Sequence, residues 1–188
     1  MMKKNLIFCF AVLFGAAGAV TFIAASSAGS ASGKSKQLVK VGVFDSRAVA
    51  IAFASSQQNR QLIAGKQEEM NKAKAAGDTK KVAELEQWGK DHQAVMHRQG
   101  FGAVSVKDLL SFIEKDLPSI AAQAGVDCIV SKWDITYKNE SAEFIDVTDS
   151  IVQPFKPDRK VLNWIEQMKK IQPISDAQLV ELEKDPNF

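Results

Sequence analysis

The side chains that most often carry out acid–base or metal chemistry are scarce in this chain, and their spacing does not bring them together. The chain has two histidines, His92 and His97, which are five residues apart, whereas metal ligands four residues apart would share a helix face. Asp91 precedes His92 directly, but neighbouring side chains on a helix diverge, so the two do not form a catalytic pair. The sequence predicts one histidine in a helix seam, one in solvent and no catalytic residue.

An acidic stretch in the second half of the chain is the other group that could bind a metal ion, through Asp134, Glu140, Glu143, Asp146 and Asp149. This stretch lacks the glycine and the ligand spacing of an EF-hand loop. Asp149 also lies beside a predicted helix start, where a carboxylate is favourable without any metal. We therefore expect no metal site and no cofactor, and the sequence predicts that the protein is not an enzyme.

The composition is that of a globular chain that is neutral beyond its first few residues. Of 188 residues, 46 % are hydrophobic and 24 % are charged, which is enough apolar material for a core. The formal net charge is +2, and Lys3 and Lys4 account for all of it. Since a dedicated nucleic-acid binder normally carries a basic surface, we expect no nucleic-acid partner.

Residues 1–33 have the pattern of a secretory signal peptide and its cleavage zone. Lys3 and Lys4 precede an uncharged apolar run at residues 6–25, and small residues follow as far as Gly33. The apolar run is long enough to span a bilayer, so an uncleaved N-terminal anchor is the alternative. In either case the sequence predicts export, and the family resemblance described below implies a location in the periplasm.

Residues 47–103 are predicted to form a projecting antiparallel helical hairpin, with its turn near Gly77 and a helix break at residues 99–102. The two helices have too few large apolar residues to bury a broad face, which fits an arm better than a layer of a core. The large apolar residues of this arm are Phe53, Leu62, Ile63, Met70, Val82, Leu85, Trp88 and Met96.

Four lysines cluster around the predicted tip of the arm: Lys72, Lys74, Lys80 and Lys81. Two interpretations remain open for them. They solvate an exposed turn, or they form a basic tip that contacts anionic lipid headgroups or acidic segments of a partner.

Residues 37–46 and 104–155 are predicted to form an α+β head, and residues 156–188 a C-terminal helical extension. A capping box of Ser105 and Asp108 predicts one helix over residues 105–124, kinked at Pro118. Cys128 is expected to be a buried small residue in a strand. The strand residues expected at an oligomer interface are Val39, Val41, Val43, Ile129, Ile135 and Tyr137.

These strands are too few to close a sheet within one chain, and open strand edges pair with other chains. We therefore expect the head to be a small β-sheet or barrel that oligomerisation completes.

The order of these elements resembles the Skp/OmpH family of periplasmic chaperones, over residues 37–155. Residues 41–46 look like the opening strand of the family. Residues 126–130, 134–137 and 145–149 look like its closing strands and its Asp-x-Thr helix start. The resemblance implies a homotrimer in which each subunit gives strands to a small β-barrel head, while helical arms enclose unfolded outer-membrane proteins.

The sequence thus predicts an exported, ATP-independent holdase chaperone, meaning a protein that binds unfolded clients and keeps them from aggregating. The large apolar residues of the arm are the candidate client contacts, each weak and effective through number. Their other role is the seam between the two helices. The alternative function is a non-catalytic envelope scaffold or adaptor that uses the hairpin as a spacer and keeps its N-terminal anchor.

Overall fold

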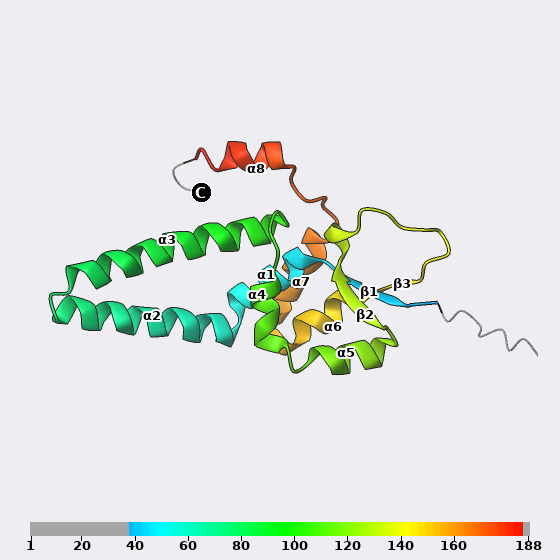
Figure 1. Cartoon of the computed structure of the whole chain (residues 1–188), viewed down its shortest axis with the longest axis horizontal. Helices are drawn as coiled ribbons and strands as arrows, with labels where there is room; N and C mark the ends of the chain where they lie inside the picture. The colour runs from blue at the N-terminus through cyan, green and yellow to red at the C-terminus, as the bar shows by residue number, and fades with distance from the viewer. Residues whose placement is uncertain (1–37, 186–188) are drawn as a thin grey trace, which may run out of the picture. The chain divides into compact units, whose positions relative to one another are not determined.

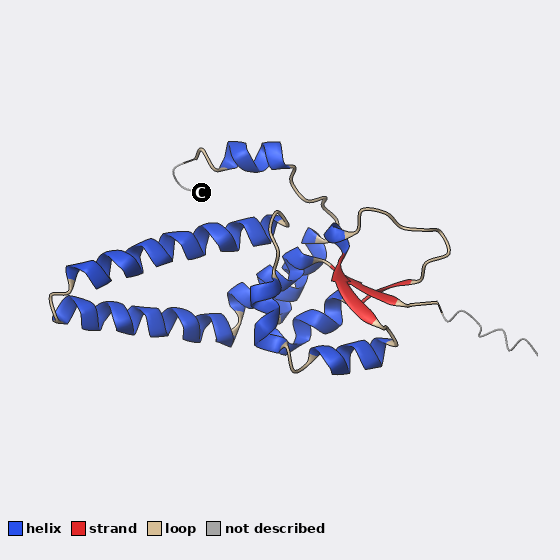
Figure 2. Ribbon diagram, viewed as in Figure 1, coloured by secondary structure: helices blue, strands red, loops and turns tan. Residues whose placement is uncertain are grey.

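Three short parallel strands form the sheet of this protein, and helices make up most of the remainder (Figures 1 and 2). The computed structural model describes residues 38–185, so the predicted signal peptide lies outside the described residues. Strand β1 (Val41–Phe44) is central, with β2 (Cys128–Ser131) on one side and β3 (Phe144–Asp146) on the other. The mixed helix–sheet architecture agrees with the predicted α+β class.

The register of the sheet assigns its residues to two faces, because paired residues on parallel strands point the same way. Gly42 pairs with Ile129 and Ile145, and these two isoleucines pack against the core. A Cβ on Gly42 would come within 3.1 Å of Val126 Cγ2 and 3.2 Å of Ile129 Cγ1. The inner face therefore needs glycine at this position.

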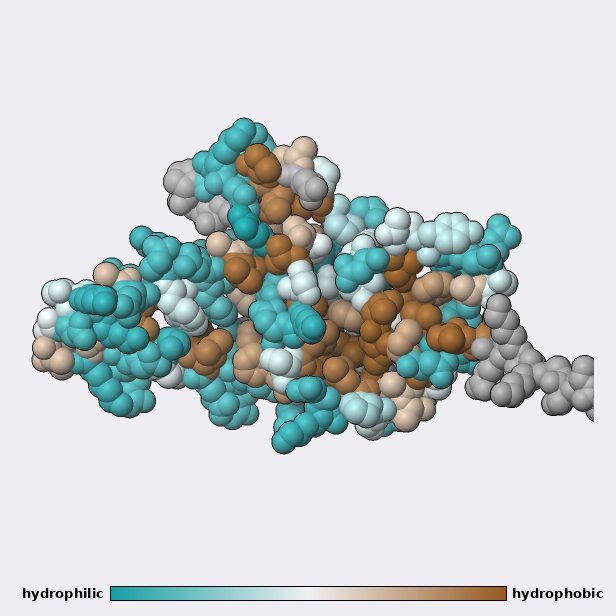
Figure 3. Space-filling view, in the orientation of Figure 1, coloured by the Kyte–Doolittle hydropathy of each residue, from teal (hydrophilic) through white to brown (hydrophobic). Residues whose placement is uncertain are grey.

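The outer face of the sheet carries Val41, Val43, Val130, Cys128 and Phe144. The three valines and Phe144 are only partly buried, and none of them belongs to the hydrophobic core cluster. Figure 3 shows hydrophobic side chains gathered over this part of the molecule. An all-parallel sheet is normally covered on both faces, and among the described residues the helical core covers one.

Helix α1 (Ser46–Ser55) belongs to the core and not to the arm to which the sequence analysis assigned it. Its Ala48, Val49, Ala52 and Phe53 are all completely buried. It packs against α3, α6 and α7. The helix ends at Ser56, whose extended backbone breaks the run and whose side chain caps the next helix. Residues 47–55 therefore do not belong to the predicted arm.

Helices α2 (Gln57–Ala75) and α3 (Thr79–Phe101) pack against each other and run side by side in Figure 1. Gly77 has a φ of +69° in the turn between them, and Asp78 caps α3 by accepting a hydrogen bond from Lys81 N. The helix break expected at residues 99–102 is found at the end of this segment, and not at Gly100. The helix continues to Phe101 and ends at Gly102, which adopts a left-handed φ of +80°.

The continuous helix predicted at residues 105–124 is wrong. The chain forms α4 (Lys107–Leu110), the 3₁₀ turn η1 (Ser111–Ile113) and α5 (Leu117–Ala124) instead. Pro118 lies in the first turn of α5, where a proline is favourable. The predicted capping box is absent, since Asp108 Oδ1 accepts a hydrogen bond from Gln99 Nε2 at 2.7 Å.

After β2 the chain leaves the sheet through the 3₁₀ turn η2 (Lys132–Asp134), so neither Ile135 nor Tyr137 lies in a strand. Val39 also lies outside β1. These three residues were expected in strands, and the expectation is wrong.

The C-terminal part contains α6 (Thr148–Val152), η3 (Gln153–Phe155), α7 (Arg159–Met168) and α8 (Asp176–Leu182). Helix α7 is part of the core, because Val161 and Ile165 are buried against α1. Helix α8 begins with a capping box of Ser175 and Gln178. No helix within residues 38–185 is long and apolar enough to cross a membrane.

Candidate functional site

Asp45, directly after β1, is the centre of a buried cluster of polar side chains at the carboxyl end of the sheet. The residue is completely buried. Its carboxylate accepts hydrogen bonds from Arg47 Nε at 3.1 Å and Nη2 at 2.8 Å, and from Trp133 Nε1 at 3.0 Å. Lys132 Nζ lies 2.7 Å from Oδ2, and Asp45 N donates to Thr148 Oγ1 at 3.0 Å. Through its side chain and its backbone N–H, this one residue thus joins β1, α1, η2 and α6.

The cluster keeps Asp45 ionised. Burial alone would raise the pKa of this carboxyl, but hydrogen bonds from Arg47, Lys132 and Trp133 outweigh it and lower the pKa from 3.8 to about 2. A carboxylate with so low a pKa is a weak general base. The arrangement therefore holds elements together and is poorly suited to proton transfer.

Arg47 extends the cluster to distant parts of the chain. Its Nη1 donates a 2.9 Å hydrogen bond to the carbonyl oxygen of Ile171, beyond α7. A Cβ on Gly102 would lie 3.2 Å from Arg47 Cγ, so the end of α3 approaches the same side chain closely. The guanidinium also lies 4.9 Å from the centre of the Trp133 ring. The position of Trp133 is therefore fixed from two directions.

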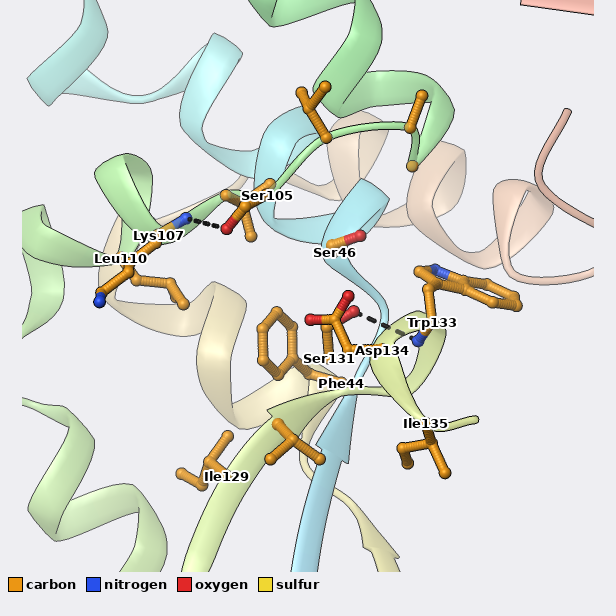
Figure 4. A pocket seen from close by; sticks show the side chains of 15 residues that line it. Phe44, Ser46, Ser105, Lys107, Leu110, Ile129, Ser131, Trp133, Asp134 and Ile135 are labelled. Carbon is orange, nitrogen blue, oxygen red and sulfur yellow. Dashed lines mark hydrogen bonds between the residues drawn. The ribbon is translucent and has the colours of Figure 1, made fainter. Parts of the chain in front are cut away.

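A pocket of about 460 Å³ lies beside this cluster, between the ends of β1 and β2, η2 and the loop after α3 (Figure 4). Ligands of open parallel sheets typically bind outside the carboxyl ends of the strands. The side chain of Trp133 forms part of the wall, and the Asp134 carboxylate points toward the middle of the pocket. Hydroxyls lie nearby on Ser46 and Ser131. This site combines apolar walls with a few polar groups.

The candidate client contacts on the predicted arm are placed very differently from one another. Phe53 is completely buried in α1, and Leu85 is 6 % exposed in α3. Leu62 and Met96 pack against the core. Phe53 and Leu85 are therefore not available to a client, which corrects their assignment. Met70, Val82 and Trp88 are partly buried, and Ile63 is 43 % exposed.

The middle of the α2–α3 pair is held by ring contacts. Trp88 stacks on His92 with ring centres 4.9 Å apart, and Lys66 Nζ lies 5.6 Å from the centre of the indole ring. Burial lowers the pKa of His92, so the ring is neutral near pH 7. His92 is thus a partly buried seam residue, as we expected from its position.

The predicted basic tip is a set of exposed lysines with acidic neighbours. Lys72 forms an ion pair with Glu68 at 2.6 Å, and the hydrogen bond that it donates to that carboxylate raises the pKa of Lys72. Lys80 and Lys81 lie 4.0 and 3.6 Å from Glu84. Lys74 is exposed in the last turn of α2. These local pairs offset much of the positive charge of the tip.

The residues expected at an oligomer interface do not share one surface. Val41 and Val43 are on the outer face of the sheet, whereas Ile129 is on the inner face. Cys128 lies in β2, as predicted, but it is exposed and not buried.

The residues 38–185 contain no group of three or more histidine, cysteine, aspartate or glutamate side chains that could hold a metal ion. Two of the acidic residues considered for metal binding have local roles instead. Asp146 Oδ1 accepts a hydrogen bond from Thr148 N at 2.8 Å, and Asp149 pairs with Lys169.

The sequence analysis missed the Asp45 cluster and the pocket. The sequence did contain one signal for this cluster, the order Asp45-Ser46-Arg47 at the junction of a strand and a helix. In this order the aspartate can cap the helix and lies next to a cation. The partners at Lys132, Trp133 and Thr148 are 87 or more residues away along the chain. Comparison with family models, with curated proteins and with solved structures found no match.

Proposed function

We propose that the protein is an exported holdase-type chaperone, which self-associates through its sheet and binds unfolded protein clients along the α2–α3 arm without ATP. The proposed function is non-catalytic and requires no cofactor. It follows the resemblance of residues 37–155 to the Skp/OmpH family.

The single observation that carries this proposal is how little the α2–α3 pair buries. Every residue of the two helices is described, and only Ala73, Leu85 and Gln99 are buried in them. Helices of this length are ordinarily stabilised by packing an apolar face. A pair that leaves so much of its surface in water is not needed to complete a core, so we infer that the surface itself is used. Partly exposed apolar groups such as Ile63, Met70 and Val82 then offer many weak contacts.

The outer face of the sheet supports self-association. Val41, Val43 and Val130 are partly buried there and lie outside the core cluster. Further copies of the chain would cover this apolar face and the unpaired edges of β2 and β3. Several arms around one cavity are what the holdase mechanism requires, and a trimer provides them.

The test is an arm shortened at a level where α2 and α3 touch. Lys66 meets the ring of Trp88, so residues 67–87 can be removed and a short glycine-rich turn can join these two positions. The base of the arm, where Leu62 and Met96 pack against the core, stays in place. We expect the shortened protein to keep its circular dichroism and its native mass. It should lose most of its ability to prevent light scattering by an unfolded outer-membrane protein diluted from urea.

Val180→Ser provides the matched control, because Val180 is 55 % exposed on α8, outside the arm. This variant should suppress aggregation as well as the unchanged protein. Equal suppression by the shortened protein would mean that the arm does not hold clients.

The alternative function, an envelope scaffold or adaptor with the arm as a spacer, is favoured by one observation. Most large apolar residues of the arm already pack against other residues of the arm or against the core at its base. A spacer would leave the aggregation of an unfolded client unchanged at any arm length. The same light-scattering assay therefore separates the two functions.

A further inference from the structure

One ionisable side chain, that of Asp134, points into the pocket beside β2. Its lining contains two ionisable residues, Asp134 and Lys107. In Figure 4 the Asp134 carboxylate points into the pocket, whereas the side chain of Lys107 extends away from it. Neither residue forms an ion pair within the described part of the chain, and Lys132 is engaged by Asp45 instead. Of the two ionisable lining residues, Asp134 is therefore the one whose charged group faces the pocket.

The rest of the lining is largely apolar, and the hydroxyls present are few. The apolar wall is made by Phe44, Val104, Leu110, Ile129 and Ile135. The volume of about 460 Å³ is within the range of pockets that bind small organic molecules. A ligand that fills the pocket must pack against the apolar wall and contact the Asp134 carboxylate.

We propose that this pocket binds an organic cation, a primary ammonium group carried on a short apolar body. The ammonium donates hydrogen bonds to the Asp134 carboxylate and to the hydroxyls of Ser46 and Ser131. The apolar body lies against Leu110 and Ile129. This site goes beyond the proposed holdase function and does not depend on it.

Other ligand chemistries fit the pocket less well. An anion would meet the Asp134 carboxylate with the same sign of charge. A neutral apolar molecule would cover that carboxylate without replacing its hydrogen bonds to water, which is costly. A cation supplies the missing charge and three donors in one group. The charge and the apolar wall together select an amphiphilic amine.

The wall of the pocket is already in place before a ligand arrives. Trp133 Nε1 donates to the buried Asp45 carboxylate at 3.0 Å, and Lys132 Nζ lies 4.4 Å from the centre of the indole ring. Asp134 follows these two residues in the same turn. A preformed site loses less conformational entropy on binding, so even a small amine should bind measurably.

The test is a titration of the ¹⁵N-labelled protein, followed by two-dimensional ¹H–¹⁵N NMR, with hexylammonium, 1-hexanol and hexanoate as probes. We expect hexylammonium to shift the amides of Ser46, Ser131 and Leu110 at the lowest concentration. The alcohol should follow at higher concentration and the carboxylate last. Asp134→Asn should weaken hexylammonium binding by about two- to five-fold, the effect of losing one solvent-exposed ion pair, and should leave 1-hexanol binding unchanged or stronger.

Glu140→Gln is the matched control, since Glu140 is exposed and does not line the pocket. It should bind hexylammonium as the unchanged protein does. A short acetylated peptide with one lysine tests the source of the ammonium: shifts at the same amides indicate a polypeptide ligand, and shifts with hexylammonium alone indicate a small molecule. Hexanoate binding as tightly as hexylammonium, or an Asp134→Asn protein with unchanged affinity, would overturn the proposal. So would the absence of shifts at the lining amides.

Discussion

Replacing Asp45 by Asn removes the negative charge from the buried cluster while it preserves the size and shape of the side chain. Trp133 Nε1 and Thr148 Oγ1 can keep their partners, because Asn still accepts a hydrogen bond and the backbone N–H of residue 45 is unchanged. Arg47 and Lys132, in contrast, lose their counter-charge. Arg47 is only 3 % exposed, so water cannot replace the lost carboxylate.

The expected loss of stability is large. The pKa of Asp45 lies at about 2 in the folded protein against an ordinary value of 3.8. At about 1.4 kcal/mol for each pKa unit, the folded state favours the ionised carboxylate by about 2–3 kcal/mol. Removing one partner of a buried ion pair also leaves the other charge buried and alone, and together these effects typically cost about 3–5 kcal/mol. We therefore expect the Asn variant to lose about 3–5 kcal/mol of unfolding free energy at pH 7.

The dependence on pH separates this mechanism from a general loss of packing. Because the folded pKa is depressed, the charge of Asp45 stabilises the fold above about pH 4, and this stabilisation is lost as the pH falls through about 2. The Asn variant has no such carboxyl. The difference between the two proteins in urea unfolding, followed by circular dichroism, should therefore be full at pH 7 and shrink between pH 4 and pH 2.

Asp149→Asn is the matched control, because the Asp149 side chain is 75 % exposed and its partner is Lys169. This surface pair should be worth less than about 1 kcal/mol. An ionic role for Asp45 would be contradicted if Asp45→Asn lowered the unfolding free energy no more than this control. It would also be contradicted if the loss were the same at pH 2 as at pH 7.

Three further substitutions test the packing assigned to the core and to the inner face of the sheet. Phe53→Ala should cost about 3–5 kcal/mol in urea unfolding, because the ring is completely buried and its centre lies 5.9 Å from that of Phe155. Ile63→Ala, at a residue 43 % exposed on α2, should cost less than about 1 kcal/mol, and equal costs would contradict the assignment. Gly42→Ala should cost about 1–3 kcal/mol through crowding against Val126, and a neutral effect in thermal unfolding would show that the inner face of the sheet has room.

Local signals in the sequence predicted the elements that depend on them. Val41 and Val43 predicted the strand that is β1, and Gly77 predicted the turn before α3. In each case the determining residues lie within a few positions of one another. Capping, left-handed glycine and strand alternation are properties of such short windows.

The errors have long-range causes. The parity of Ile129, Ile135 and Tyr137 predicted one strand, but the chain turns away after β2 because Lys132 and Trp133 are drawn to Asp45. No spacing within residues 128–137 reveals a partner so far away along the chain. The predicted helix at residues 105–124 failed for a similar reason, since Gln99 takes the Asp108 carboxylate that the capping box needed.

The sequence also contained a signal for the buried helix α1, but these residues were assigned to the arm and not to the core. Residues 48–54 form a nearly unbroken apolar run that ends just before two serines. Such a run is typical of a buried helix, and α1 is one. The pocket, in contrast, brings together segments from residues 44–46, 102–110 and 129–135, and which charged side chain faces it depends on how the chain folds there.

Amide hydrogen exchange, measured with and without an unfolded outer-membrane protein, tests the proposed holdase most directly. In the free protein α2 and α3 should exchange before α1, since they bury far less. If the arm holds the client, the bound client slows amide exchange along residues 57–101 and leaves the exchange rates of α8 unchanged. Exchange in α2 and α3 that is identical with and without bound client would contradict it.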